Sequence, residues 1–404
     1  MANISDYLDW RGDISFAYDP FNEVDSLVLS ELIYTDFDGI VGDEYRPLPE
    51  VCAEYFRLHT EEEILGRDTF FMRAPLLLRK LEHSVRYKNC LIGHYENEIR
   101  PERTEQMAAA SFLPGDGTQF IAFRGTDDTL VGWKEDFSLS YMKETPGQRD
   151  AVDYINRNSL QSSLPLRVGG HSKGGNFAVY ASAFCDPLIA GRILEVYNHD
   201  GPGFRDEILS AAEYQRIRPK IISIVPQNSI IGMLLGNAVQ PLITDSSGSG
   251  IMQHDALTWQ VRRNRFVRVR TRTGMSLYFE KAIREWLKSI EDSRRQPFIE
   301  MLFTFFEYTG ASTLKELKEN KKALPLMLSC MSEMPPASQK EFRAVIYELL
   351  KSEGEIALDE ISERIRTMIE TTPADFLDRL KEGIGNAGDE LLEHLTPLLP
   401  GKDN

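Results

Sequence analysis

A serine flanked by glycines stands at the centre of residues 170–174, which read Gly-His-Ser-Lys-Gly and match the pattern G-x-S-x-G. An apolar run over 164–168 precedes this segment, and a helix-forming run over 177–184 follows it. A strand, a sharp turn and a helix form the context that exposes a serine hydroxyl as a nucleophile at a sheet edge. We therefore predict that Ser172 is a nucleophile. The alternative is a glycine-rich turn from strand to helix with a bystander serine.

A second polar turn lies upstream, where an apolar run over 120–123 ends in Arg124-Gly125-Thr126. Acyl transfer needs two backbone N–H groups aimed at the developing oxyanion. One comes from the residue after the nucleophile and one from a loop after an earlier strand. Lys173 and Thr126 hold these positions in the sequence. We expect their amides to form an oxyanion hole, the alternative being that the turn simply ends a strand.

Three matching segments occur in order: Phe-Arg-Gly-Thr over 123–126, Trp133 with Asp136, and Gly-His-Ser-Lys-Gly-Gly over 170–175. Together they resemble the class-three lipase branch of the α/β-hydrolases, whose members carry F-R-G-[ST] followed by G-H-S-x-G-G. The lysine makes the chain still more similar to an uncharacterised bacterial lipase-like group that has GHSKGGN. The resemblance covers roughly residues 1–272. It implies an α/β-hydrolase fold and a serine esterase or lipase with a Ser, Asp, His triad.

The resemblance gives Ser172 the role of nucleophile and expects a histidine downstream of the last strands. Of the seven histidines, His254 fits, because it follows a loop rich in glycine and serine over 246–250. The chain order of serine, acid and histidine also favours His254 as the general base. His199 is a weaker candidate, since it ends the strand directly after the serine turn.

The acid departs from the class-three pattern. In that family the aspartate follows the strand that corresponds to residues 220–225, but here residues 226–229 read Pro-Gln-Asn-Ser. An acid is needed to hold the imidazole in the correct tautomer and to stabilise the imidazolium. Asp200, at the end of the strand after the serine turn, is the best replacement, and a turn-forming role before Gly-Pro-Gly is an equal alternative. The remaining candidates are Asp245, Asp255 and, without a charge, Asn228.

The implied reaction is hydrolysis of a carboxylic ester, lipid-like or otherwise hydrophobic, through an acyl-enzyme on Ser172. One alternative is an amide or thioester hydrolase, or an acyltransferase, with the same nucleophile. Another is a catalytically silent binding protein with a hydrolase fold, which the missing class-three aspartate keeps open. No metal-ligand spacing, Walker loop or dinucleotide fingerprint is present in the sequence. We therefore expect chemistry without a metal or cofactor.

Two further features allow both a functional and a structural interpretation. Residues 230–243 form an apolar loop. Within it, Met233, Leu234 and Leu235 would contact substrate if the loop were a lid or an acyl-binding wall. The alternative is a short core helix. Lys173 places a cation beside the nucleophile, where it could attract a carboxylate-bearing substrate, but pairing with a surface acid is the favoured interpretation.

Hydrophobic periodicity predicts the elements that position these residues. Helical spacing over 24–36 and 73–87 indicates a helical N-terminal region, and turn residues over 114–117 indicate a hairpin. We expect a fold of the α/β class, in which an antiparallel meander leads into a mostly parallel sheet with helices on both faces. The predicted strands lie over 91–99, 106–113, 118–124, 164–168, 193–198 and 220–225, followed by a terminal hairpin over 257–272.

The change of pattern near residue 275 predicts two domains. Residues 1–274 would form the catalytic α/β-hydrolase domain, and residues 275–404 a helical C-terminal domain of unknown role. The most apolar segment of the chain, residues 298–308, is interrupted by glutamates and is shorter than the roughly 20 residues of a transmembrane span, so we expect no transmembrane segment.

The composition indicates which binding partners and which cellular compartment to expect for this protein. The formal net charge of −16 argues against sequence-independent nucleic-acid binding, which needs a basic surface. Four widely spaced cysteines in mostly apolar surroundings predict buried free thiols and a reducing compartment. The first residues are acidic where a secretory signal would be basic, so we expect a cytoplasmic protein. The expected partner is a small-molecule or lipid-like acyl substrate, and no oligomeric state is indicated.

Overall fold

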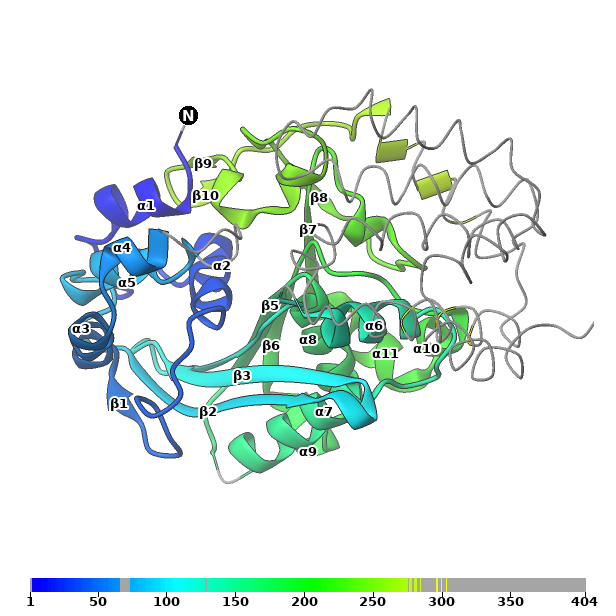
Figure 1. The fold of residues 1–404 in the computed structure, drawn as a ribbon, viewed down its shortest axis with the longest axis horizontal. Coiled ribbons are helices and arrows are strands. Elements are labelled where there is room, and N and C mark those ends of the chain that lie inside the picture. Colours follow the sequence, from blue (N-terminus) through cyan, green and yellow to red (C-terminus); the bar gives the residue numbers. More distant parts are fainter. Residues whose placement is uncertain are drawn as a thin grey trace, which may run out of the picture. The chain divides into compact units, whose positions relative to one another are not determined.

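The computed structural model describes residues 2–65, 73–127, 129–160 and 162–274, with isolated positions up to residue 303. The chain divides into two compact units, Met1–Glu280 and Lys281–Asn404. The description that follows concerns the first unit (Figure 1). The helical domain predicted over 275–404 lies almost wholly outside the described residues.

A sheet of eight strands, counted over the described residues, forms the centre of the first unit, in the spatial order β1 to β8. The first four strands pair antiparallel, and β4 to β8 pair parallel (Figure 1). The predicted meander leading into a parallel sheet is therefore confirmed. The strands are β1 (Arg46–Pro47), β2 (Leu91–Arg100), β3 (Glu105–Leu113), β4 (Gln119–Phe123), β5 (Leu166–His171), β6 (Ile193–His199), β7 (Ile221–Pro226) and β8 (Leu242–Thr244).

Helices cover both faces of this sheet. The N-terminal layer consists of α1 (Ile4–Arg11), α2 (Glu23–Leu32), α3 (Leu48–Leu58), α4 (Glu61–Leu65) and α5 (Leu76–Glu82). The opposite layer contains α6 (Leu130–Ser138), α7 (Pro146–Ser159), α8 (Lys173–Phe184), α9 (Pro187–Arg192), α10 (Asp206–Ser210) and α11 (Ala212–Ile217). In Figure 1 the helices of the first layer are blue and lie on one side of the sheet, and those of the second layer are mainly green and lie on the other. Capping boxes begin three of these helices, at Asn3, Asn22 and Thr145.

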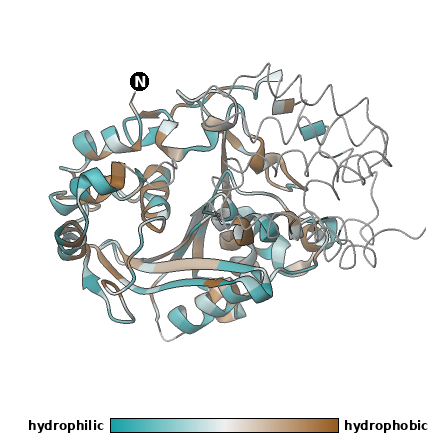
Figure 2. Cartoon of the chain, viewed as in Figure 1, coloured by the Kyte–Doolittle hydropathy of each residue, from teal (hydrophilic) through white to brown (hydrophobic). Residues whose placement is uncertain are grey.

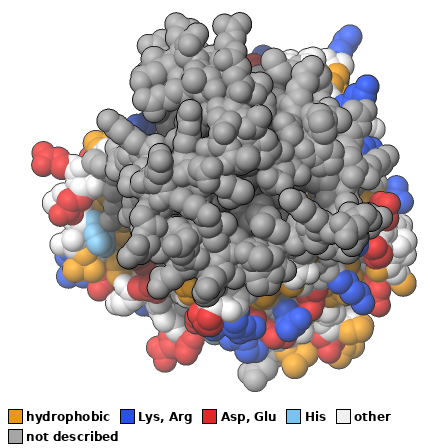
Figure 3. Space-filling view, turned by 45° about the vertical axis from the view of Figure 1, so that its right-hand side comes forward, with side chains coloured by type: hydrophobic (Ala, Val, Ile, Leu, Met, Phe, Trp, Pro, Cys, Tyr) orange, Lys and Arg blue, Asp and Glu red, His pale blue; other side chains and the backbone are white. Residues whose placement is uncertain are grey.

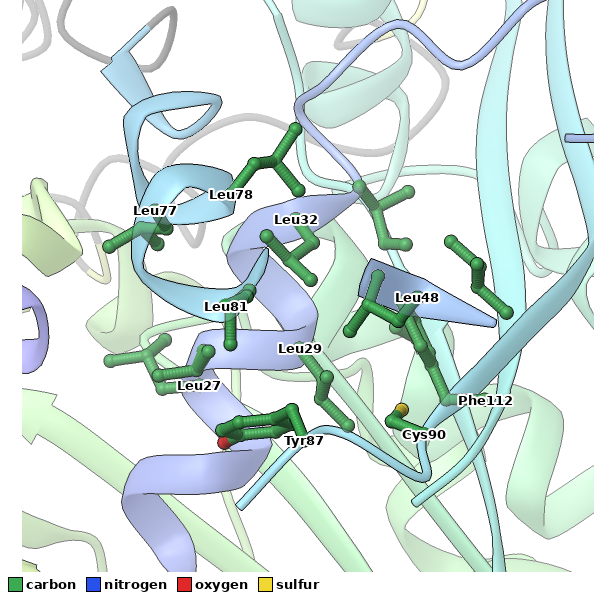
Figure 4. Close-up of a cluster of buried hydrophobic side chains, with 14 of the residues drawn as sticks. Leu27, Leu29, Leu32, Leu48, Leu77, Leu78, Leu81, Tyr87, Cys90 and Phe112 are labelled. Atoms are coloured by element: carbon green, nitrogen blue, oxygen red, sulfur yellow. The ribbon is translucent and has the colours of Figure 1, made fainter. Parts of the chain in front are cut away.

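Each helical layer buries its own apolar core against the sheet. Figure 2 shows hydrophobic residues along the strands and on the helices that cover them. On the second face, Phe123, Tyr154 and Phe177 are fully buried. Burial on both faces is what a parallel sheet requires. Part of the N-terminal core is drawn in Figure 4, which labels Leu27, Leu29, Leu32, Leu48, Leu77, Leu78, Leu81, Tyr87, Cys90 and Phe112.

Three cysteines, Cys52, Cys90 and Cys185, are buried free thiols, as predicted, and Cys330 lies outside the described residues. Burial raises the pKa of the Cys185 thiol to about 11. On the face drawn in Figure 3, acidic and basic side chains are interspersed over the surface of the described residues. Within the described part of the chain, no helix combines the length and apolar content needed to cross a bilayer.

The predicted terminal hairpin is much shorter than residues 257–272. Only β9 (Val261–Arg262) and β10 (Arg265–Phe266) pair with each other. Residues Ala256–Thr258 instead form a turn of 3₁₀ helix, because the Asp255 side chain accepts the N–H of Leu257 and caps that turn. The predicted helices over 24–36 and 73–87 are also shorter than expected, and correspond to α2 and α5.

Helix α2 is buried on almost every side, so its polar residues need partners inside the protein. Asp25 receives two hydrogen bonds from the Arg86 guanidinium, at 2.6 and 2.7 Å, and neither side chain is exposed. The hydroxyls of Tyr7 and Tyr87 donate to the same carboxylate, at 3.0 and 2.8 Å. This cluster joins α1, α2 and the segment after α5.

Replacing Asp25 with alanine would remove the closest carboxylate from the buried Arg86 guanidinium and leave it only the more distant Asp19, whose Oδ2 lies 3.8 Å from Nη1. Breaking a buried ion pair in this way costs about 3–5 kcal/mol, and the loss is measurable by urea unfolding followed by circular dichroism. Asp9→Ala provides a matched control, because it removes a more exposed ion pair with Lys80 and should cost about 0–1 kcal/mol. Equal losses in the two variants would contradict the importance assigned to the buried cluster.

Candidate active site

The turn between β5 and α8 holds Ser172 in a strained conformation. Ser172 has φ 57° and ψ −134°, although it is not a glycine. A non-glycine residue with positive φ persists only where the surrounding structure enforces it. Here the Ser172 N–H donates to the carbonyl of His199 at 2.9 Å, which ties the turn to the neighbouring strand β6. The strand, sharp turn and helix predicted around this serine are all present.

Two glycines allow α8 to pass this close to the sheet. A Cβ on Gly170 would lie 2.2 Å from the carbonyl carbon of Gly174, so a side chain there would separate β5 from the helix. A Cβ on Gly174 would lie 2.1 Å from the carbonyl oxygen of Phe123, at the end of β4. The first contact is the close approach of helix and preceding strand expected from the sequence. The second joins the helix to a neighbouring strand.

Asp200 and His254 meet beside this turn. Asp200 directly follows β6, and its Oδ2 accepts a hydrogen bond from His254 Nδ1 at 2.6 Å. Its other oxygen, Oδ1, accepts the Ser229 hydroxyl at 2.5 Å. Because Nδ1 is the donor, Nε2 is the ring atom available to act as a base. Asp200 is buried and, like Ser172, has positive φ, at 53°.

The loop that carries His254 is fixed by two residues that the sequence did not single out. His171 Nε2 donates to the backbone carbonyl of His254 at 2.9 Å, and the centroids of the two imidazole rings lie 4.7 Å apart. Trp259 Nε1 donates to the carbonyl of Gln253 at 2.7 Å. His171 belongs to the G-x-S-x-G segment, so its position in that motif was the available signal.

The N-terminal helices also reach the site through His171. The hydroxyl of Tyr34 lies 3.2 Å from His171 Nδ1, and Glu31 Oε1 of α2 lies 3.2 Å from the same atom. Burial lowers the pKa of the His171 imidazole well below its usual value. Burial also raises the pKa of the Glu31 carboxyl well above the usual value of a glutamate. Both shifts favour the neutral forms. Burial behind the serine turn therefore favours an uncharged cluster, in which the Tyr34 hydroxyl lies within hydrogen-bond distance of His171.

The Arg124-Gly125-Thr126 turn lies against the nucleophile. A Cβ on Gly125 would be 2.7 Å from the Cβ of Ser172, so only glycine fits there. The Thr126 hydroxyl donates to Asp136 Oδ2 of α6 at 2.5 Å. Burial raises the pKa of Asp136 to about 6, against the opposing effects of Lys173 and this hydrogen bond. The Thr126 side chain thus attaches this turn to α6, and its backbone amide remains a candidate oxyanion donor.

The side chain of Lys173 is not at the surface. It is fully buried, and its Nζ lies 3.0 Å from Oε2 of Glu135, which is equally buried. The favoured expectation of an ion pair with an acid is correct, but the expectation that this acid lies at the surface is wrong. The buried cation also rules out the alternative in which Lys173 attracts substrate. Its backbone amide starts α8, where N–H groups point out of the helix.

The other candidate residues have different partners. His199 Nε2 lies 2.8 Å from the Ser26 hydroxyl, and burial lowers the pKa of His199 to about 3. Asp255 caps a 3₁₀ turn, and burial raises its pKa to about 6. Asp245 Oδ1 accepts the N–H of Ser246, and Asn228 Oδ1 accepts the hydroxyl of Thr273.

The apolar loop is one 3₁₀ turn (Ile231–Met233) followed by bends and irregular structure up to β8, not a core helix. A Cβ on Gly232 would lie 2.4 Å from Asp200 Oδ1, which places the turn against the candidate acid. The carbonyl of Leu234 accepts the N–H of Gly203 at 2.8 Å. Met233, Leu234 and Leu235 are half-buried, so their side chains are partly accessible.

Across the described residues, no group of three or more His, Cys, Asp or Glu side chains is arranged to hold a metal ion. The arrangement instead suits acyl transfer. It combines a strained serine, an imidazole oriented by a buried carboxylate, and two turns whose backbone amides lie near the serine.

Comparison with known proteins identifies the family to which the chain belongs. A search of curated proteins gives no match. Among solved structures, the chain is similar to M37 lipase, with 15% sequence identity over 53% of this chain and 70% of that chain, and a TM-score of 0.31. The sequence model of the Mbeg1-like family matches residues 81–304, which is more than half of the chain and includes Ser172, Asp200 and His254. The chain therefore belongs to the Mbeg1-like family.

Proposed function

We propose that this protein is a lipase-like serine hydrolase that cleaves a carboxylic ester through an acyl-enzyme on Ser172. The observation that carries the proposal is the 2.6 Å hydrogen bond between His254 Nδ1 and Asp200 Oδ2, beside a serine held at positive φ. A serine in an ordinary glycine-rich turn would not need an imidazole oriented by a buried carboxylate. The resemblance to class-three lipases supports the same function.

In the first half of the reaction, His254 Nε2 takes the proton of the Ser172 hydroxyl while Oγ attacks the ester carbonyl carbon. Asp200 keeps the proton on Nδ1 and stabilises the imidazolium that forms. Ser229 donates to the other oxygen of this carboxylate and so keeps it directed at the imidazole. Asp200 thus replaces the aspartate that class-three lipases carry after the next strand.

The tetrahedral intermediate carries a negative oxygen, which the backbone amides of Thr126 and Lys173 would stabilise. His254 then returns its proton to the alcohol leaving group, and the acyl group stays on Ser172. In the second half, water attacks the acyl carbon, and His254 again acts first as base and then as acid. This cycle consumes one water and regenerates the enzyme without a cofactor.

The acyl chain of the substrate would lie along the wall formed by Met233, Leu234 and Leu235. This wall is next to Asp200, because Gly232 contacts the Asp200 carboxylate. Its partly accessible apolar side chains suit a hydrocarbon chain. A hydrophobic acyl ester is therefore the proposed substrate class.

Labelling by a fluorophosphonate tests the nucleophile. The wild-type protein should be labelled, because the reagent captures a serine activated by a base, and Ser172→Ala should not be labelled. His254→Ala should lose turnover to a similar extent as Ser172→Ala, because the members of a triad act as a unit. Labelling of Ser172→Ala at the wild-type rate would place the nucleophile elsewhere. An unlabelled wild-type protein would favour a silent binding protein.

The role of Asp200 is tested by Asp200→Asn, which preserves the shape of the side chain but not its charge. We expect kcat for short p-nitrophenyl esters to fall by about 10³- to 10⁴-fold with an intact fold. Asp255→Asn is the matched control, since Asp255 is also mostly buried but caps a turn, and it should retain kcat within about tenfold. A loss below about tenfold in Asp200→Asn would remove Asp200 from the proposed triad.

A series of p-nitrophenyl esters of increasing acyl length tests the apolar wall. Met233→Ala should raise KM about tenfold for long acyl chains and leave short esters unchanged, because each buried methylene contributes about 0.8 kcal/mol. Leu188→Ala is the control, because Leu188 is an exposed residue of α9. A uniform effect on all chain lengths would show that Met233 does not line the acyl site.

A further inference from the structure

The ion pair between Lys173 and Glu135 lies directly behind the serine turn, and neither side chain is exposed. Lys173 Nζ lies 3.0 Å from Glu135 Oε2 and also donates to Oε1 of Gln106 at 3.3 Å. The carbonyl of Gly132 accepts a longer hydrogen bond from it, at 3.5 Å. A lysine is rarely fully buried unless it is paired, so this arrangement requires all of these acceptors.

The Glu135 carboxylate accepts hydrogen bonds from groups on three other elements. Its Oε2 accepts the N–H of Gln106 on β3 at 3.1 Å, as well as the Lys173 ammonium. Its Oε1 accepts the N–H of Gly147, in the first turn of α7, at 2.8 Å. Glu135 itself belongs to α6, and Lys173 begins α8. One buried carboxylate therefore joins β3, α6, α7 and α8 at a single point.

Both proposed oxyanion donors are attached to this point. One donor is the backbone amide of Lys173 itself. The other is the amide of Thr126, whose hydroxyl donates to Asp136, the residue after Glu135 on α6. The separation of the two amides therefore depends on how α6 is fixed relative to the start of α8. The Lys173–Glu135 contact is a direct charged link between these two helices.

We infer that Lys173 and Glu135 are positioning residues that set the geometry of the oxyanion hole. This inference rests on the proposed function, because an oxyanion hole has a purpose only if Ser172 forms tetrahedral intermediates. Catalysis by such donors depends on their being held in place before the reaction. A buried ion pair with four further hydrogen-bonding groups holds the donors in one arrangement, because each bond fixes a direction that an apolar contact would leave open.

The competing interpretation is that the pair only stabilises the fold, and the chain contains a matched control. Asp25 and Arg86 form an equally buried ion pair. The residues that share its hydrogen bonds, Tyr7 and Tyr87 among them, all belong to the N-terminal helical layer. Removing both charges there should change stability without changing the oxyanion hole.

The experiment compares two double variants, K173M/E135Q and R86M/D25N. The glutamine keeps an oxygen for the N–H of Gly147, and both variants lose two charges. For each we would measure unfolding in urea, kcat and KM for a short p-nitrophenyl ester, and the rate of fluorophosphonate labelling. K173M/E135Q should lose about 10²-fold in kcat with KM within about twofold of wild type, because misplaced donors weaken transition-state binding. R86M/D25N should retain kcat within about threefold, whatever stability it loses.

The outcomes separate the inference from the proposed function. If the wild type is neither labelled nor active, the proposed function fails and the inference fails with it. If the wild type reacts and K173M/E135Q keeps its kcat and labelling rate, the inference is overturned while the proposed function stands. Equal losses of kcat in the two double variants would also overturn it. If K173M/E135Q does not fold, the single variant Glu135→Gln tests the inference instead. A fall in kcat with an unchanged KM would support the inference, and an unchanged kcat would overturn it.

Discussion

The close crossing of strand β5 and helix α8 is the constraint on which the rest of the site depends. The crossing is possible because Gly170 and Gly174 have no side chains to separate the strand from the helix. It forces Ser172 into a positive φ that a serine adopts only when its surroundings require it. The turn is anchored to β6 because the Ser172 N–H donates to the carbonyl of His199. Asp200 directly follows His199, so the serine has a defined position relative to Asp200.

Around this turn the protein uses charged and neutral polar groups differently. On the α6 side, the ion pair of Lys173 and Glu135 joins helices α6 and α8. On the α2 side, burial favours neutral His171 and Glu31 behind the serine. Unpaired charge is costly in a buried environment, so a neutral cluster lets the N-terminal layer approach the site without a counterion. The first arrangement is a pair of opposite charges, whereas burial favours uncharged groups in the second.

The N-terminal helices are therefore part of the site and not an appendage. Helix α2 packs against the centre of the sheet and contributes Glu31 next to His171, and Tyr34 follows it in the chain. His171 in turn holds the backbone of His254. A path of direct contacts thus runs from the N-terminal layer through the serine turn to the proposed base. The buried pair of Asp25 and Arg86 lies at the first turn of α2, at the opposite end of that helix from Glu31.

Local patterns in the sequence were sufficient to predict the serine turn, the strands around it and the mixed sheet. Glycine spacing and hydrophobic period are local properties, and they determine where a strand must stop and a helix begin. Chain order also pointed to His254. The choice of Asp200 over Asp245, Asp255 and Asn228 was open in the sequence, because it depends on which side chain reaches one ring nitrogen. The tertiary structure decided that contact, and it alone revealed Glu135 as the partner of Lys173, since segments far apart in the chain meet only when the sheet and its two helical layers pack.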